Sequence, residues 1–340
     1  MFRLARNYRG ITQSELAEKS KISQGVLSKI DHGLNVPNNQ QLKNIAAALD
    51  FPVDFFTQSA RDLPSGLVFH RKRVALREKE RARIESEVKL RLNCLKILAS
   101  QLDIDSNIET VDLNDYGNDP RKVANALRFR WNIPHGPISN VVNLLENNGI
   151  IIIRFDFGNE LLDGFFILDD RPCIALNSRF PMERQRFTLC HELGHIVMHR
   201  MPDENMESES DAFASEFLMP SNDILEHFAH HKINLQYLFS LKSYWKVSVA
   251  ALIIKARDMG FITPSNVRRL YMQMNALQIR KKEPYPVQDE RPSLASEIIN
   301  AYTNELHYSQ PEIQKLLFLN FNDFIRFFNP FQLNQATSTI

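Results

Sequence analysis

The sequence has little cysteine, little glycine and almost no net charge. Its three cysteines, Cys94, Cys173 and Cys190, are too few and too scattered for a disulfide framework, so we expect reduced thiols and a cytoplasmic protein. Only 11 glycines stand beside 23 phenylalanines, which favours helices with aromatic cores over glycine-shaped loops. A net charge of +1 excludes a whole-protein field that would draw the chain onto nucleic acid or membrane. Any DNA binding must therefore come from a local basic surface.

Long apolar runs are also absent. The longest run, residues 149–153, has the length of a β-strand and cannot span a membrane. Residues 1–9 contain no apolar core of signal-peptide length. We therefore expect no membrane partner. The 340 residues, of which 24% are charged, leave room for two or three ordinary globular domains.

Residues 1–57 are predicted to form a domain of five short helices, the first beginning at Phe2. Thr12 and Glu15 have the spacing of a capping box, Ser23 is a suitable N-cap, and Gly33 suits a left-handed helix end. The other four helices are expected at 13–19, 24–31, 38–49 and 51–56.

Residues 58–118 are predicted to be a linker around Pro64 followed by a long helical segment. The periodicity predicts a polar helix over 68–102, which begins with the basic run 70–73. We favour a solvated helix that joins two domains over a nucleic-acid contact at this helix.

Residues 119–222 alternate between helical and strand-like patterns, which predicts a domain with a small sheet. Helices are expected over 120–130, 137–147, 182–200 and 207–218, and strands over 150–155, 164–168 and 173–177. The remaining domains are predicted at 223–280, with a second helix-turn-helix-like pattern capped by Ser248, and at 281–340, a helical region. The fold class is thus α+β and mostly helical. The apolar side chains of 316–328 are expected to form either a terminal core or an oligomer interface.

The helix over 182–200 carries the sequence His191-Glu192-Leu193-Gly194-His195. Two histidines four residues apart lie on one face of a helix, where their imidazoles can bind one zinc ion. The glutamate between them is typical of the base that takes a proton from a zinc-activated water. Gly194 leaves room beside the metal or for close helix packing. Strands that precede such a helix can supply an edge for an extended substrate peptide, but the pattern does not say which strand is the edge.

A catalytic zinc also needs a third protein ligand. Glu209 shares a helix face with Phe213, and a carboxylate on that buried side is costly unless a cation pairs with it. Glu207, Asp211 and Glu216 are the alternatives.

Two further residues on the histidine helix have simpler interpretations. We expect His199, four residues after His195, to be a helix-end residue near solvent rather than a ligand. Cys190 is expected to be buried and inert.

The stretch 186–195, followed by Glu209 and by the Phe-Ala to Leu-Met-Pro ending of 213–220, resembles the ImmA/IrrE family of metallopeptidases. The resemblance covers about residues 120–270. It implies a zincin-like fold in which His191, His195 and Glu209 are zinc ligands and Glu192 is the base, with manganese as an alternative metal. Asp211-Ala212 departs from the asparagine that members often carry at the first of these positions.

Residues 1–57 resemble the Xre/Cro-type helix-turn-helix family in the segments 12–17 and 22–30. In that geometry the second helix of the motif enters the major groove of double-stranded DNA by its N-terminal end. Gln24 and Ser28 are then expected to reach base edges, and Gln13, Ser23 and Lys29 to contact phosphates. The alternative is a helix-turn-helix used for dimerisation or protein contact.

Together these patterns predict a DNA-binding transcriptional regulator with zinc-dependent endopeptidase activity. By resemblance to the family, the substrate is a helix-turn-helix repressor or an antitoxin-type regulator, cut in trans or in the chain's own linker, in a stress, mobile-element or toxin–antitoxin circuit. We expect a homodimer. The alternatives are a transcription factor in which the metal only stabilises the fold, and a peptidase activated by single-stranded DNA.

Overall fold

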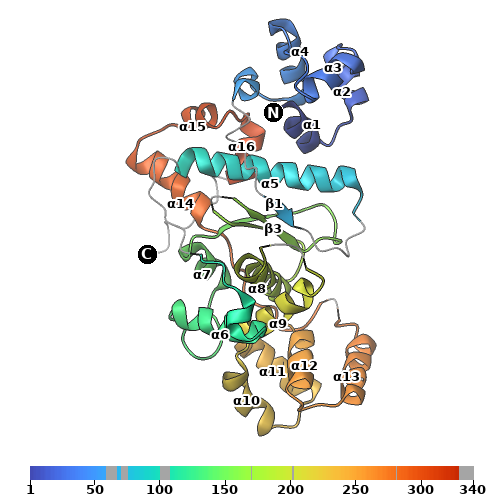
Figure 1. Cartoon of the computed structure of the whole chain (residues 1–340), viewed down its shortest axis with the longest axis vertical. Helices are drawn as coiled ribbons and strands as arrows, with labels where there is room; N and C mark the ends of the chain where they lie inside the picture. Colours follow the sequence, from blue (N-terminus) through green and yellow to red (C-terminus); the bar gives the residue numbers. More distant parts are fainter. Residues whose placement is uncertain are drawn as a thin grey trace. The chain divides into compact units, whose positions relative to one another are not determined.

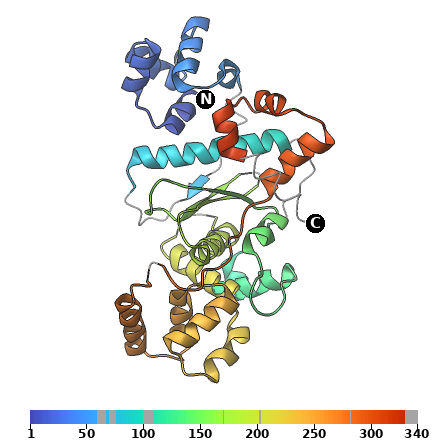
Figure 2. The same cartoon turned by 180° about the vertical axis from the view of Figure 1, so that it is seen from behind.

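The computed structural model describes residues 1–58, 67–69, 76–99, 108–169, 171–200, 203–280 and 282–328. Its contacts divide the chain into two compact units (Figures 1 and 2). Unit 1 consists of Met1–Gly66, Ala75–Asp105 and Ser293–Ile340, and unit 2 of Leu67–Val74 and Ser106–Pro292. The expected basic run 70–73 and the linker around Pro64 lie outside the described residues. In the part of the chain that is described, no helix combines the length and the apolar character needed to cross a membrane.

The N-terminal part of unit 1 is the expected set of short helices. They are α1 (Phe2–Arg9), α2 (Gln13–Ser20), α3 (Gln24–Asp31), α4 (Asn39–Leu49) and the 3-10 turn η1 (Val53–Thr57). Thr12 and Glu15 form the predicted capping box at the start of α2, and Gly33 has a φ of 70° as expected. The core of this helix set is built from Ala5, Leu16, Leu27, Ile30, Ile45, Leu49 and Phe55.

The long helix α5 (Glu78–Ala99) is shorter and less solvated than the sequence suggested. Ile84, Val88 and Leu92 are fully buried, because α5 packs against α1 and against α14 (Leu294–Asn300) in the same unit. The Tyr302 hydroxyl donates to the Leu98 carbonyl oxygen at 3.0 Å. The prediction of a solvated connecting helix was therefore wrong: α5 is a core element of unit 1.

The C-terminal helices complete unit 1. After α14 the chain forms η4 (Ala301–Glu305), α15 (Gln310–Leu316) and α16 (Phe321–Phe328). Phe324, Phe327 and Phe328 of α16 are buried, whereas Phe321 is exposed, and Phe327 packs edge-on against Tyr8 with ring centroids 5.8 Å apart. Of the two alternatives from the sequence, these contacts support a terminal core.

A small mixed sheet forms the centre of unit 2. Its order is β1 (Leu67–Phe69), β3 (Gly164–Leu168), β4 (Cys173–Asn177) and β2 (Ile151–Phe155). β2 runs parallel to β4, whereas β3 is antiparallel to both β1 and β4. Three strands match their predicted positions closely. The fourth, β1, falls where the sequence pattern predicted the start of the long helix, so that part of the helix prediction was wrong.

Helices of unit 2 cover one face of this sheet, and α8 (Met182–Met198) runs along that face (Figures 1 and 2). α8 packs against β3 and β4 on one side and against α9 (Met206–Leu218) on the other. α7 (Val141–Asn147) packs on α8 and β2, and α6 (Pro120–Arg130) packs on α9 and on the turn η3 (Leu113–Tyr116). The core of unit 2 therefore extends through α8, which carries the histidine pair.

The rest of unit 2 is helical. Its helices are α10 (Ser221–Ala229), α11 (Leu235–Trp245), α12 (Val249–Asp258) and α13 (Pro264–Ala276). Ser248 caps α12 as expected, accepting a hydrogen bond from the Ala251 amide. Leu238, Leu252 and Ile253 are buried in the common core of unit 2, so this helix pair is packed rather than free-standing. The domain boundaries within the unit stay a prediction.

Candidate metal centre and nucleic-acid interface

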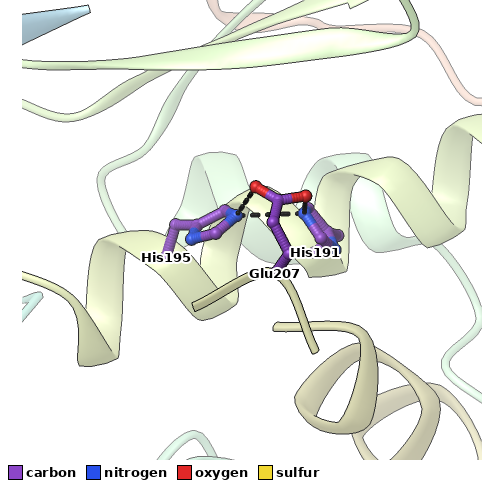
Figure 3. Close-up of side chains that lie close together, drawn as sticks. All are labelled: His191, His195 and Glu207. Atoms are coloured by element: carbon purple, nitrogen blue, oxygen red, sulfur yellow. Dashed lines mark hydrogen bonds and ion pairs between the residues drawn. The ribbon is translucent and has the colours of Figure 1, made fainter. Parts of the chain in front are cut away.

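Two imidazoles meet on the buried face of α8. His191 and His195 are 1% and 3% exposed, and their Nε2 atoms are 3.0 Å apart (Figure 3). The one-turn spacing along the helix aligns the two rings, and Phe166 of β3 stacks on His195 with ring centroids 5.6 Å apart. The sheet thus holds the second ring from one side.

The carboxylate of Glu207 lies next to both imidazoles (Figure 3). Its oxygens are 3.7 Å from His191 Nε2 and 3.5 Å from His195 Nε2. The close packing of α9 on α8 allows this approach: an added Cβ at Gly194 would lie 3.1 Å from the Phe213 ring and 3.3 Å from the Ser210 Cα. Of the two roles foreseen for Gly194, the structure supports close helix packing.

A second carboxylate orients His191. Asp211, one turn after Glu207 on α9, has an oxygen 2.8 Å from His191 Nδ1. An ionised carboxylate only accepts hydrogen bonds, so Nδ1 carries the proton and donates it. With this proton on Nδ1, the Nε2 atom of neutral His191 has a lone pair, which points at the cluster.

A chain of two groups orients His195 in the same way. Glu209 has an oxygen 2.8 Å from His199 Nε2, and His199 Nδ1 is 3.1 Å from His195 Nδ1. Burial lowers the pKa of His199, and this effect is larger than the opposite effect of the hydrogen bond to Glu209. The ring is therefore neutral near pH 7. His199 therefore donates to Glu209 and accepts from His195 Nδ1, which leaves a lone pair on His195 Nε2.

The arrangement fits a zinc ion. The two Nε2 atoms face each other 3.0 Å apart beside a carboxylate, and a bound metal cation would satisfy all three groups. Ligand atoms each about 2.1 Å from a tetrahedral zinc lie about 3.4 Å apart, close to the separations found among His191, His195 and Glu207. Hydrogen bonds that fix the ligand tautomers are a regular feature of zinc sites.

The structure separates the four acidic candidates for the third ligand. Glu207 lies at the histidine pair, Asp211 on the outer nitrogen of His191, and Glu209 on His199. Glu216 is remote from the histidines and pairs with Lys255, its oxygen 2.6 Å from the Nζ atom. Glu209, the ligand implied by resemblance, is thus engaged with His199 and not brought to the pair.

The remaining residues of the histidine helix are buried. Glu192, the expected base, is 4% exposed and directly follows His191. Burial raises the pKa of the Cys190 thiol to about 12, so Cys190 is buried and inert as expected. His199 is 7% exposed at the C-terminal end of α8, so the expectation of a residue near solvent was wrong.

The expected DNA-reading helix α3 presents its N-terminal end to solvent. Ser23, Gln24 and Lys29 are exposed and Ser28 is half-buried, and Gln24 and Ser28 are one turn apart on the same face. Ser23 makes no side-chain capping bond to α3. These four side chains are at least partly accessible, and their contacts with DNA stay a prediction.

Gln13 differs from the other four predicted DNA contacts. Its Nε2 atom donates to Asp31 Oδ2 at 2.8 Å, and Arg6 forms an ion pair with the same carboxylate. Gln13 also lines a surface hollow of about 590 Å³, together with Glu78 and Lys79 from the first turn of α5. The Gln13 amide has two N–H groups, so a phosphate contact there would use the one that Asp31 does not engage.

The N-terminal helix-turn-helix defines a regulator-like domain. The histidine pair on the H-E-x-x-H helix α8, with Glu207 of α9 beside it, defines a metallopeptidase-like domain. Comparison with protein families agrees with this class. Residues 2–56 match the family model described as helix-turn-helix, and residues 145–257 match the IrrE N-terminal-like domain, a peptidase family. The chain is therefore a fusion of an Xre-type helix-turn-helix domain with an IrrE-like peptidase domain. Among curated proteins, no significant match was found.

The sequence reasoning missed the two groups that orient the histidines. Asp211 follows Glu207 by four residues, which places both carboxylates on one face of α9, and this spacing was a usable signal. The role of His199 had no such signal, because it depends on how closely α9 approaches the end of α8.

Proposed function

We propose that the chain is a DNA-binding transcriptional regulator whose IrrE-like domain is a zinc-dependent endopeptidase. The meeting of the His191 and His195 Nε2 atoms with the Glu207 carboxylate, on a helix where Glu192 stands between the two histidines in the sequence, carries this proposal. A purely structural zinc site has no use for a buried glutamate at the base position. The matches to the two families support the two halves of the proposal.

In this proposal the zinc ligands are His191, His195 and Glu207. The preference for Glu207 over the earlier prediction of Glu209 rests on distance: Glu207 faces the two lone pairs, whereas Glu209 is engaged with His199. Asp211 and Glu209 then act as positioning residues for the two imidazoles.

Zinc, when bound, lowers the pKa of a water molecule toward neutrality and polarises the scissile carbonyl group. Glu192 would hold the attacking water molecule and accept its proton as the water oxygen forms a bond to the carbonyl carbon. The same carboxyl group then gives the proton to the leaving amide nitrogen as the C–N bond breaks. Glu192 is buried on the helix that carries both histidines, which supports this role.

We propose a helix-turn-helix repressor or antitoxin-type regulator as the substrate, in a stress, mobile-element or toxin–antitoxin circuit. The chain's own N-terminal domain belongs to the same structural class as such a substrate. Cleavage in trans and cleavage in the chain's own linker around Pro64 are both consistent with this proposal. A homodimer, a cytoplasmic location and activation by single-stranded DNA stay predictions.

The test is mass spectrometry of purified protein incubated with zinc or manganese and a candidate repressor, with and without single-stranded DNA. We expect cleavage by the wild type and by Glu204→Gln, which removes an exposed acid near the cluster, but none by Glu192→Gln. No cleavage under any condition, with zinc bound, would instead support a metal-stabilised transcription factor.

DNA binding is tested by selecting operators from random double-stranded DNA. We expect Gln24→Ala to weaken binding to the selected site by about tenfold, because a bidentate contact to adenine contributes about 1–3 kcal/mol. Gln273→Ala, in the exposed face of α13, is the matched control. Equal binding by both variants at all salt concentrations would argue for the alternative, a helix-turn-helix used for protein contact.

A further inference from the structure

β3 is the strand of the sheet that lies closest to the metal centre in the described part of the chain. Its Phe166 stacks on His195, and an added Cβ at Gly164 would lie only 2.8 Å from Thr188 of α8. β3 therefore lies directly on α8. An extended peptide that reaches the histidines by adding a strand to the sheet would pair with β3, because β4 is already paired on both sides.

The outer edge of β3 is occupied by the chain itself. β1 pairs with it antiparallel, with Leu67 opposite Leu168, Val68 opposite Ile167 and Phe69 opposite Phe166. The last of these pairs places the Phe69 backbone opposite the residue whose ring stacks on His195. β1 thus ends beside the metal centre, in the position that a bound peptide strand needs.

We propose that β1 is an internal substitute for the substrate: a strand of this chain that fills the peptide-binding edge of β3 and must leave before a substrate strand can bind. This inference rests on the proposed peptidase function and names its substrate class, an extended apolar segment of a partner protein. The sequence Leu67-Val68-Phe69 is apolar and has high β-propensity, so we expect an incoming segment of the same kind.

The size of β1 allows such an exchange. It has three residues, whereas β2, β3 and β4 have five each. Each intramolecular hydrogen bond contributes only about 1 kcal/mol net, so a strand this short is held weakly. An incoming segment that pairs with all five residues of β3 replaces those bonds and adds others. β1 therefore raises the affinity that a substrate must have without blocking the site permanently.

The first test measures peptide binding without catalysis. A fluorescein-labelled peptide with the sequence of residues 64–72 is titrated into Glu192→Gln protein and into the same protein carrying Val68→Pro and Phe69→Pro. Adjacent amides of a strand point to opposite sides, so one of the two prolines removes a hydrogen bond to β3. Val68→Thr with Phe69→Tyr keeps both amides and is the matched control.

We expect the anisotropy titration to give about tenfold tighter binding to the proline variant than to the control, because a resident strand worth about 1.4 kcal/mol lowers apparent affinity by that factor. Equal affinity for both proteins, or binding to neither, would overturn the proposal. Circular dichroism and zinc binding establish that the proline variant is folded.

A second variant tests the same idea without weakening the fold. Leu67→Cys with Leu168→Cys joins directly opposed residues at the end of β3 remote from the Phe166 pair. Oxidation should lock β1 in place and abolish peptide binding, and reduction should restore the affinity of the Glu192→Gln protein. Unchanged peptide binding in the oxidised form would show that β1 does not occupy the binding edge.

Cleavage assays then separate the two proposals. Peptide binding that depends on β1, without cleavage of any repressor, would leave the strand proposal intact and contradict the peptidase function. Cleavage at equal rates by the wild-type, proline and oxidised cysteine forms would support the peptidase function and contradict the strand proposal.

Discussion

The proposed metal centre depends on which ring nitrogens of its histidines carry protons. Asp211 fixes a proton on the outer nitrogen of His191, and Glu209 acts through His199 to fix one on His195. Both inner nitrogens are then bases beside a third carboxylate. Three acidic residues within one helix therefore have different tasks, which depend on their positions around α9 rather than on their chemistry.

Zinc affinity distinguishes these tasks. We expect Glu207→Gln to weaken zinc binding by more than a hundredfold, since it removes a ligand, and Glu209→Gln by about tenfold, as is usual for a group that orients a ligand. Competition with a chromophoric chelator at pH 7.5 measures both, with Glu204→Gln as the control. The reverse order would identify Glu209 as the ligand, in agreement with the family resemblance.

At the scale of elements, the contact between α8 and α9 brings the histidines and the carboxylates together. Gly194 lies at this contact, where the Phe213 ring and the Ser210 backbone leave less space than a methyl group needs. Helix propensity therefore favours a residue with a side chain at position 194, whereas the packing of α9 favours glycine.

We expect Gly194→Ala to destabilise unit 2 by about 1–3 kcal/mol through overpacking and to weaken zinc binding. Gly25→Ala adds the same methyl group to a helix where no atom lies within 4 Å, and should leave unit 2 unchanged. Urea denaturation followed by the fluorescence of Trp131 and Trp245 measures the effect. Unchanged stability in Gly194→Ala would mean that α9 can shift without cost.

Glu216 links α9 to α12 through a buried ion pair. Burial alone would raise its pKa, but Lys255 and Ser221 together hold the pKa below the usual value. A carboxylate whose folded-state pKa is lowered stabilises the protein fully above its unfolded pKa of about 4.3, and this stabilisation is lost as pH falls through the folded-state value.

We therefore expect the free energy of unfolding of the wild type to fall as the pH is lowered from 5 to 3.5. Glu216→Gln should have a weaker dependence over that range and, at pH 7, a loss of about 3 kcal/mol, because Lys255 is left buried without its partner. Denaturant titrations at several pH values measure this. Exposed Glu226→Gln is the control, and parallel curves for all three proteins would rule out Glu216 as a contributor.

The elements with strong local signals were predictable. Capping residues and apolar periodicity located α2, α3 and α6, and β-branched runs located β2, β3 and β4. Within the site, the i, i+4 spacing placed His191 and His195 together. The predictions that failed concern elements whose structure depends on segments far away in the sequence. β1 forms because β3 offers it an edge to pair with. One face of α5 is buried because α1 and α14 cover it.

At the scale of the molecule, unit 1 joins both ends of the chain. Asp323 of α16 is 2% exposed and accepts hydrogen bonds from the Tyr8 hydroxyl at 2.6 Å and from Arg9 at 2.6 and 2.9 Å. Burial raises the pKa of Tyr8, and Asp323 adds to that effect. Arg326 continues the link by pairing with Glu87 of α5.

Asp323→Ala should therefore destabilise unit 1 by about 3 kcal/mol, since it leaves Arg9 and Tyr8 without their shared acceptor. Hydrogen exchange of the α1 amides should rise, while that of α8 stays constant. Asp54→Ala, which removes an exposed acid from the same helical domain, is the control. Equal protection of α1 in both variants would mean that α16 contributes nothing to holding it.

This discontinuous unit also sets an order of events during synthesis. The N-terminal helices leave the ribosome first, but the acceptor for Tyr8 and Arg9 lies 314 residues beyond Arg9. All of unit 2 is translated in between, so it has time to fold before unit 1 is complete. A chain interrupted before α16 would thus carry a finished peptidase domain and an unfinished DNA-binding one.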